Sequence, residues 1–272
     1  MTTGMTIALL ISTYNWPEAL QRVLESVLLQ TRKPDEILIA DDGSGESTKQ
    51  VIDAFRIKTN IPVKHAWQED NGFQKTKILN KALALCESEY IVQIDGDIIM
   101  SPQFIADHIR ISKPHHVITG SRASLTKEFT LEFLKSKKPI DYNLLRKNSP
   151  YKMNAARIPF LTPIFASRYK TKGKHKFYSK GCNMAFWMSS LIKVNGFNED
   201  MYEWGHEDSE LVVRLLKIGE KKLFMKFSGV TYHLWHQVSS MERKSINQTI
   251  LENTVASEDF RIKNGLDKYL NK

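Results

Sequence analysis

Short apolar runs alternate with amphipathic helical patterns over the first 120 residues, and this alternation restricts the fold more than any other feature. Strand-like and helical stretches occupy, in turn, residues 6–12, 17–31, 36–40, 48–57, 63–67, 76–86 and 90–94. In the first helical pattern Leu20, Val23, Leu24 and Val27 recur at three- and four-residue spacing, as in a helix with one buried face. The order predicts an α/β fold with a mainly parallel sheet flanked by helices, right-handed crossovers, and ligands beyond the carboxyl ends of the strands.

Polar side chains follow three of these predicted strands, at the point where each strand ends. They are Ser12, Thr13, Tyr14 and Asn15 after the first strand, Asp41 and Asp42 after the second, and Asp95, Gly96 and Asp97 after the fourth. Two carboxylates one residue apart at the end of a buried strand are costly unless a cation lies between them. Oxygen ligands suit Mg²⁺ or Mn²⁺, which commonly hold substrate phosphates, and Gly96 would let a bulky ligand approach the backbone. An Asp-Gly turn between strands explains the tripeptide taken alone, but three strand ends at one edge favour a ligand site.

A second polar cluster, with the sequence Trp-Gly-His-Glu-Asp, lies at residues 204–208. It follows a predicted strand at 183–188 and precedes a helical pattern at 209–218. Asp208 is placed to be the N-cap of that helix, which explains one acidic residue there. The N-cap role leaves Trp204, His206 and Glu207 beside it unexplained.

Two more strands are expected at 222–227 and 230–235, followed by a polar, helical and peripheral tail. The second of these strands carries His233 and His236. Their odd separation places the two rings on opposite faces of a regular strand. One metal ligand is therefore the simpler outcome, and both bind one ion only if the strand ends between them.

The net charge of +9 is concentrated in one segment of the 272-residue chain. Residues 126–180 contain 14 Lys and Arg against 3 Asp and Glu, a net of +11, so the remainder carries −2. Nine aromatic residues and four prolines interleave these charges, and the prolines argue against long regular elements. The segment is either a solvated face or a surface for an anionic partner, whether lipid, phosphate or nucleic acid. No zinc-finger spacing or RNP-like motif supports nucleic acid, which we do not expect as a partner.

Composition and missing motifs exclude several classes of protein. The hydrophobic share of 42% is that of a soluble globular protein, and no stretch approaches the roughly 20 apolar residues that span a bilayer. The first residues lack the basic region of a secretory signal, and two cysteines make neither a disulfide framework nor a thiolate metal site. We therefore expect a cytoplasmic protein. Glycine-rich dinucleotide-binding and P-loop motifs are missing from the sequence.

Taken together, the ordered motifs resemble those of inverting family-2 glycosyltransferases with the GT-A fold. Residues 11–15, 30–31, 34 and 41–44 resemble the nucleotide-binding opening of that family, and Asp95-Gly96-Asp97 resembles its DXD metal motif. Residues 181–186, 195–199 and 204–208 are similar to the acceptor-side block of β-1,4-galactosyltransferases and chondroitin polymerases, and residues 232–236 to the closing metal-ligand strand. The matches span residues 5 to 237 in family order, with 126–177 unmatched. Each motif is weak alone, but the ordered set is specific.

The resemblance implies a donor site for a UDP-sugar. The residues implied for the nucleotide sugar are Thr13, Tyr14, Asn15, Asp42, Lys77, Asn80, Asp95 and Gly96. Asp42 would accept a hydrogen bond from the uracil N3–H, and Asp97 would coordinate Mn²⁺ or Mg²⁺ together with His233, His236 or both. Lys77 and Asn80 are equally well explained as solvated helix residues.

The resemblance also implies an acceptor site at the second cluster. Asp208 would be the general base that removes the proton of the acceptor hydroxyl, Glu207 would hold the acceptor sugar, and Trp204 would stack on its apolar face. A single displacement inverts the anomeric configuration. His206 stands where the galactosyltransferases often have glycine, so their acceptor geometry cannot be copied.

The implied organisation is one GT-A catalytic domain at 1–240, followed by a helical tail at 241–272. The domain would comprise a nucleotide-sugar half at 5–120, a basic insertion at 126–180 and an acceptor half at 181–237. Its function would be transfer of a hexose or N-acetylhexosamine, with galactose favoured, to a glycan or lipid-diphosphate-linked acceptor in surface polysaccharide synthesis. The basic segment would then meet the anionic inner face of the cytoplasmic membrane. Two alternatives remain: another metal-dependent nucleotide-using transferase or phosphohydrolase, which gives residues 204–208 no role, and a basic membrane- or nucleic-acid-binding module, which accounts for 126–180 alone.

Overall fold

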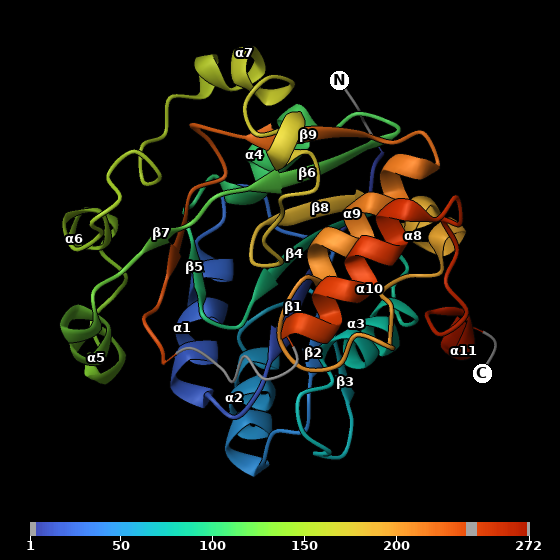
Figure 1. Cartoon of the computed structure of the whole chain (residues 1–272). Helices are drawn as coiled ribbons and strands as arrows, with labels where there is room; N and C mark the ends of the chain where they lie inside the picture. The colour runs from blue at the N-terminus through green and yellow to red at the C-terminus, as the bar shows by residue number, and fades with distance from the viewer. Residues whose placement is uncertain (1–3, 238–243, 271–272) are drawn as a thin grey trace.

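A computed structural model describes residues 4–237 and 244–270 of the chain (Figure 1). The strands are β1 (Ile7–Thr13), β2 (Glu36–Asp41), β3 (Val63–Trp67), β4 (Tyr90–Asp95), β5 (Ile98–Met100), β6 (His116–Gly120), β7 (Ala123–Ser124), β8 (Met184–Trp187), β9 (Lys221–Met225) and β10 (Thr231–His233). The helices are α1 (Pro17–Leu28), α2 (Glu46–Arg56), α3 (Lys75–Leu83), α4 (Phe104–Ile111), α5 (Lys127–Lys135), α6 (Tyr142–Lys147), α7 (Thr162–Ala166), α8 (Met188–Val194), α9 (Glu207–Lys217), α10 (Lys244–Ala256) and α11 (Asp267–Leu270). Two 3-10 turns, Pro159–Leu161 and Gly173–His175, flank α7 in the chain.

A seven-stranded sheet in the order β3-β2-β1-β4-β8-β6-β9 forms the centre of the molecule. Only β8 runs antiparallel to its neighbours in this sheet. A smaller sheet, in the order β5-β10-β7, lies beside it. The prediction of a mainly parallel α/β sheet flanked by helices is confirmed.

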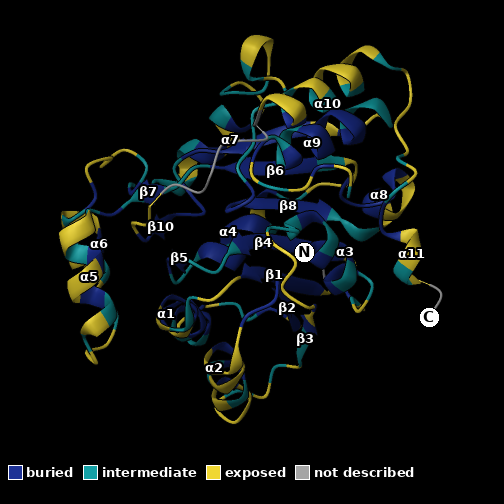
Figure 2. Ribbon diagram, turned by 60° about the horizontal axis from the view of Figure 1, so that its bottom comes forward, coloured by how far each residue is buried: buried dark blue, intermediate teal, exposed yellow. Residues whose placement is uncertain are grey.

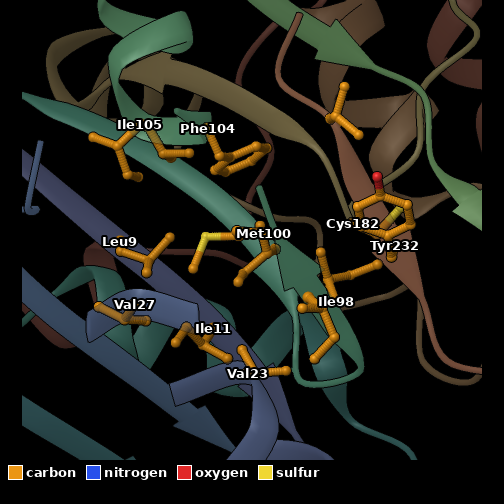
Figure 3. Close-up of a cluster of buried hydrophobic side chains, with 14 of the residues drawn as sticks. Leu9, Ile11, Val23, Val27, Ile98, Met100, Phe104, Ile105, Cys182 and Tyr232 are labelled. Atoms are coloured by element: carbon orange, nitrogen blue, oxygen red, sulfur yellow. The ribbon is translucent and has the colours of Figure 1, made fainter. Parts of the chain in front are cut away.

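Alternate side chains of the central strands serve two different cores, because successive residues of a strand point to opposite faces. Leu9 and Ile11 of β1 pack with α1, α2 and α4 on one face, whereas Ala8 and Leu10 pack with α3, α8 and α9 on the other. Figure 3 shows part of the first core, where Leu9 and Ile11 lie near Val23 and Val27 of α1. The central strands of the sheet are correspondingly dark in the burial view (Figure 2). Burial on both faces explains why these strands read as continuous apolar runs.

Several helix boundaries differ from the predicted ones by a few residues, and two of the differences have identifiable reasons. The helix expected to reach residue 31 ends at Leu28, and the chain turns so that Gln30 and Thr31 donate hydrogen bonds to the carbonyls of Ser101 and Pro102. The prediction that Asp208 is an N-cap is wrong. His206 holds the N-cap position of α9 with φ of 68°, and Asp208 lies in the first helical turn.

Elements α4, β5, β6 and β7 are not among the predicted ones, because each is a short stretch whose place is set by its partners.

In the basic segment the prolines do restrict regular structure: its longest element is α5, with nine residues. Helices α5 and α6 lie at the side of the molecule, away from the central sheet (Figures 1 and 2).

The carboxyl-terminal residues are helical, as expected, but they are not peripheral. Helix α10 packs along α9, and the side chain of Leu266 is fully buried in the second core. Lys217 of α9 donates hydrogen bonds to the carbonyls of Thr254 and Asp259. The predicted boundary between residues 240 and 241 lies outside the described residues. Within the part of the chain that the structure describes, no helix combines the length and apolar character needed to cross a membrane.

Candidate active site

The carboxyl ends of β1, β2 and β4 meet at one edge of the central sheet. Strand β1 lies between the other two, with Thr13 paired to Asp41 and Ser12 paired to Asp95. The structure therefore brings the three predicted polar clusters together, as the parallel order requires.

Asp42 lies at the end of β2 with its carboxylate turned inward. It is 5% exposed, and it accepts hydrogen bonds from Gln68 Nε2 at 2.6 Å and from the Gln74 backbone N–H at 2.8 Å. Burial raises the pKa of Asp42 to about 6, although these two donors oppose the rise. A carboxylate oxygen accepts more than one hydrogen bond, so Asp42 keeps the capacity to accept another from a ligand.

The residues after β1 connect the first two strand ends. Asn15 adopts a left-handed backbone with φ of 43°, donates from its N–H to Ser44 Oγ, and accepts from the Gly45 N–H at 2.9 Å. Thr13 is buried, whereas the ring of Tyr14 is half exposed and its hydroxyl donates to Asp70. These contacts form one wall beside Asp42.

Asp95, at the end of β4, has partners from two directions. Ser12 Oγ donates to Asp95 Oδ1 at 2.9 Å, and Lys75 Nζ lies 2.6 Å from the same oxygen. The neighbouring Gly96 does not leave open space. A Cβ there would lie 2.9 Å from the Ser12 carbonyl oxygen and 3.0 Å from Thr13 Oγ1. Gly96 thus permits close approach of the end of β1, rather than the ligand approach expected from the sequence.

Asp97 and two histidines form a compact cluster suited to a metal ion. His233 Nε2 and His236 Nε2 each lie 3.2 Å from Asp97 Oδ2. Strand β10 ends at His233, so the opposite-face rule does not extend to His236 and both rings reach the same carboxylate. Burial disfavours the charge of Asp97, but the two imidazoles outweigh it and hold the pKa of Asp97 below its usual range.

Asp208 projects from the first turn of α9 toward the turn before β8. The Gly181 N–H donates to Asp208 Oδ2 at 2.6 Å, and a Cβ on Gly181 would lie 2.6 Å from Oδ1. Oδ1 is buried and has no hydrogen-bond partner among the described residues. Burial and then the carboxylate of Glu207 raise the pKa of Asp208 to about 7, while Lys75 opposes the rise. One oxygen is thus fixed by the backbone, and the other is available to take a proton.

Lys75 joins the two predicted halves of the site, and sequence reasoning missed it. Burial opposes its charge, but the carboxylates of Asp95, Asp208 and Glu207 outweigh burial and raise the pKa of Lys75. It stands at the first position of α3, so it points to the strand ends rather than along the helix surface. The available signal was its place directly before the predicted helix, opposite the carboxylates of β4.

The two residues expected on α3 behave differently from Lys75. Lys77 Nζ donates to Gln74 Oε1. Asn80 is fully buried, and its side chain bonds the N–H and the carbonyl of Phe197. The expected contact of Asn80 with the base or phosphates is therefore wrong in this structure: its amide holds the 196–197 turn.

The remaining predicted residues lie in the loop before α9. Glu207 is buried and accepts from the Gly205 N–H at 3.2 Å, whereas Trp204 is 38% exposed. At the other side of the site Trp67, at the end of β3, is 54% exposed and donates from Nε1 to the Ser44 carbonyl. The strand-end rule could have found Trp67 and the adjacent Gln68, because β3 ends at the same edge as β2.

Comparison with known proteins agrees with this arrangement. Residues 8–191 match the family described as Glycosyl transferase family 2, and residues 163–237 match the N-terminal domain of galactosyltransferase. The chain is 25% identical over 240 residues to a hyaluronan synthase from Pasteurella multocida, covering 84% of this chain and 24% of that protein. It is 24% identical over 240 residues to a chondroitin synthase from Escherichia coli, covering 78% and 32% of the two chains. The chain thus spans about a quarter to a third of these relatives.

Solved structures share the fold at low sequence identity. A mannosyltransferase from Pyrobaculum calidifontis, in complex with GDP-Man and Mn²⁺, has a TM-score of 0.60 at 17% identity over 87% of this chain and 59% of that one. S. aureus TarS 1-349, in complex with UDP-GlcNAc, has a TM-score of 0.63 at 14% identity over 97% and 69% of the two chains. The fold, the site at the strand ends and a family match over more than half of the sequence lead to one conclusion: this chain belongs to glycosyl transferase family 2 and is a glycosyltransferase.

Proposed function

We propose that this glycosyltransferase is metal-dependent and inverting, and that it transfers a hexose or N-acetylhexosamine from a UDP-sugar to a glycan or lipid-diphosphate-linked acceptor. The observation that carries the proposal is the position of Lys75, in contact with Asp95 on the donor side and within electrostatic reach of Asp208 and Glu207 on the other. Relatives named hyaluronan and chondroitin synthases support a role in polysaccharide assembly, here surface polysaccharide. The galactosyltransferase match over residues 163–237 favours a galactose-type sugar.

The donor side would bind the nucleotide through groups already ordered by hydrogen bonds. Asp42 would accept from the uracil N3–H beside Thr13 and Asn15, with Tyr14 offering an exposed ring for stacking. Asp95 would lie near the ribose or the metal. TarS, which has been solved with UDP-GlcNAc, supports a uridine nucleotide, while the mannosyltransferase with GDP-Man shows that the fold also accepts guanosine.

Asp97, His233 and His236 would hold a divalent cation. Asp97 Oδ1 is buried without a partner among the described residues, and one carboxylate with two imidazoles suits Mn²⁺ better than Mg²⁺, which prefers oxygen ligands. The mannosyltransferase complex with Mn²⁺ supports that choice. When bound, the cation would offset the charge that develops on the diphosphate leaving group.

Asp208 would act as the general base of the transfer. Its Oδ1 would take the proton of an acceptor hydroxyl as that oxygen bonds to the anomeric carbon, while the bond from the anomeric carbon to the diphosphate breaks. The Gly181 N–H holds the other oxygen, so the base is oriented before the acceptor arrives. Glu207 and Trp204 would position the acceptor sugar. Because attack occurs opposite the leaving group, an α-linked donor gives a β-glycoside.

A screen of UDP-sugars for hydrolysis in the presence of Mn²⁺ tests the proposed function. At least one UDP-hexose or UDP-N-acetylhexosamine should be hydrolysed slowly without acceptor, and EDTA should stop the reaction. Hydrolysis confined to GDP-sugars would overturn the uridine assignment. The family match supports a transferase over the alternatives of a phosphohydrolase or a basic binding module.

Replacing Lys75 by Gln should change the pH dependence of turnover. Asp208 must be ionised to act as a base, so turnover should rise with pH through its pKa near 7. Lys75 lowers that pKa, so Lys75→Gln should move the rising limb to higher pH and reduce turnover several-fold at neutral pH. The profile is measured with saturating donor. Lys75→Arg keeps the charge, so turnover in this variant should rise over the same pH range as in the wild type. An unchanged pH dependence of turnover in Lys75→Gln would contradict this electrostatic role.

A cytoplasmic enzyme that uses a lipid-linked acceptor must work at an anionic membrane surface, and we propose that the basic segment provides the contact. Lys172, Lys174 and Lys176 are exposed, and so are the large apolar side chains of Tyr151 and Phe160 in the same segment. Each lysine near such a surface contributes about 1 kcal/mol, which is screened beyond a Debye length of about 8 Å.

Liposome co-sedimentation tests this contact. Binding should require anionic lipid, weaken with salt, and fall when Lys172, Lys174 and Lys176 are all changed to Gln. The matched control changes Lys135, Lys137 and Lys147, exposed residues of α5, α6 and the link between them, to Gln. Equal losses in both variants, or no binding of the wild type at low salt, would contradict a membrane contact by residues 172–176.

A further inference from the structure

Four lysines next to the acceptor side of the site lie close together without acidic partners. This lysine cluster consists of Lys170, Lys180, Lys222 and Lys226. None of its members forms an ion pair with a carboxylate of the described residues. Two of them, Lys222 and Lys226, are less than 10% exposed. Cationic side chains are rarely so buried unless they are paired.

Shared aromatic rings limit how far apart three of these ammonium groups lie, those of Lys170, Lys222 and Lys226, while Lys180 lies within electrostatic reach of Lys170. Lys170 Nζ lies 4.5 Å and Lys222 Nζ 5.9 Å from the centre of the Tyr178 ring. Lys170 Nζ and Lys226 Nζ each lie 5.5 Å from the centre of the Tyr169 ring. Each pair of nitrogens is therefore no farther apart than the sum of its two distances. Tyr169 and Tyr178 come from the loops beyond α7, whereas Lys222 lies in β9, against which α7 packs (Figure 1).

The charges of the cluster act on one another. Burial and then Lys170 lower the pKa of Lys222 to about 8, and the same two causes lower the pKa of Lys226. Burial, Arg122 and Lys170 act in the same direction on the pKa of Lys180. A nearby anion would relieve this repulsion, because opposite charges within a few ångströms favour the ionised form of both.

Only part of the cluster is occupied by internal hydrogen bonds. Lys222 Nζ donates to the carbonyls of His175, Lys176 and Tyr178, and Lys226 Nζ donates to Asn154 Oδ1. Lys170 Nζ and Lys180 Nζ have no hydrogen-bond acceptor among the described residues. Lys170 also has a left-handed backbone with φ of 53°, a rare state for a lysine. The ammonium groups of Lys170 and Lys180 are thus available to bind a ligand, and those of Lys222 and Lys226 add positive charge nearby.

The position of Lys180 ties the cluster to the acceptor. Lys180 directly precedes Gly181, whose N–H holds Asp208 Oδ2. Arg122 extends the positive charge toward the donor side. A guanidinium nitrogen of Arg122 lies 3.6 Å from Cys182 Sγ. The charge of Arg122 lowers the pKa of Lys180 and interacts with the carboxylates of Asp95 and Asp97. An anion held by Lys170 and Lys180 would therefore belong to the molecule whose hydroxyl meets Asp208.

We propose that the lysine cluster is a subsite for a negatively charged acceptor, which binds a carboxylate or phosphate group of the acceptor glycan through Lys170 and Lys180. This rests on the proposed function, since it takes Asp208 as the base that meets the acceptor. Hydrogen bonds between ammonium and carboxylate or phosphate are charge-assisted, so they select an anionic over a neutral glycan. The subsite thus favours acidic polymers over neutral ones.

Ligand-observed NMR of the whole chain with three probes tests the subsite. The probes are methyl β-D-glucuronide, its neutral counterpart methyl β-D-glucoside, and glycerol 1-phosphate, with UDP and Mg²⁺ present to fill the donor site. The wild type should bind at least one anionic probe and not the glucoside. The variant Lys170→Gln/Lys180→Gln should bind that probe about tenfold more weakly, as expected for the loss of about 1.4 kcal/mol. The stronger of the two anionic probes identifies a carboxylate or a phosphate as the natural group.

Three controls make the outcome decisive. Lys170→Arg/Lys180→Arg keeps the charge and should retain binding, and Lys135→Gln/Lys137→Gln removes the same charge elsewhere in the basic segment and should also retain it. Equal binding of glucuronide and glucoside, full binding by the Gln pair, or an equal loss in the Lys135/Lys137 variant would overturn the proposal. UDP binding is measured in parallel by calorimetry with Mn²⁺: its absence from the wild type would refute the proposed function, whereas its presence with no anion binding refutes only the subsite.

Discussion

Asp208→Asn is expected to lower turnover by about two orders of magnitude or more while leaving the affinity for the UDP-sugar unchanged, because only the proton acceptor is lost. The amide oxygen of Asn can still accept from the Gly181 N–H, so the loop geometry should persist. The measurements are donor affinity by calorimetry and single-turnover transfer with saturating donor. Asp200→Asn, an exposed change in the preceding loop, is the matched control. Transfer at nearly the wild-type rate would place the base elsewhere, with Glu207 as the next candidate.

The same variant should also show how the raised pKa of Asp208 makes the stability of the fold depend on pH. Its pKa in the folded protein is raised to about 7, so between about pH 4 and 7 the folded state holds a proton that the unfolded chain releases. Stability from this group therefore falls as the pH rises through that window. Asn does not titrate, so the melting temperature of Asp208→Asn relative to wild type should increase from pH 4 to pH 8. A constant difference would contradict the raised pKa.

Asp97→Ala is expected to abolish the joint stabilisation of the fold by UDP and Mn²⁺. For the wild type, a ligand at about 100 times its dissociation constant adds roughly 2.7 kcal/mol to the free energy of unfolding. The variant loses the carboxylate that both His233 and His236 approach, so the cation and the diphosphate should no longer bind together. Thermal unfolding with UDP, Mn²⁺, both or neither measures the effect.

Separate substitutions of the histidines refine this result. Because both rings lie at the same distance from Asp97, His233→Gln and His236→Gln should each weaken Mn²⁺ binding. UDP binding that is unaffected by EDTA and by Asp97→Ala would refute the metal site. A loss of Mn²⁺ binding in one histidine variant alone would leave a single imidazole ligand.

The strand-end site follows from the sequence because parallel strands impose a common direction. Once β1, β2 and β4 are assigned, their carboxyl ends must share an edge, so strand periodicity places Asp42 and Asp95 at the same edge of the sheet. The acidic start of α9 is also evident from its sequence, although the exact N-cap is not, since helix ends are set by local backbone geometry such as the left-handed His206.

Contacts between distant segments needed the tertiary structure. Strand periodicity left the choice between His233 and His236 open, and only the end of β10 at His233 brings both to Asp97. Asn80 and Lys77 occupy helix positions that periodicity cannot separate from those of Lys75, yet Asn80 bonds the 196–197 turn and Lys75 bonds Asp95.

The sequence by itself determined the α/β class, the common edge at which the polar strand ends lie, and the identity of the carboxylates there. These features depend on local periodicity and on the direction of parallel strands. The tertiary structure alone decided where the cations lie: Lys75 beside the carboxylates of the site, and the lysine cluster, without acidic partners, across the loops beyond α7 and β9. The physical reason is that electrostatic partners are chosen by distance in space, and residues far apart in the chain acquire that distance only when the sheet and its helices have packed.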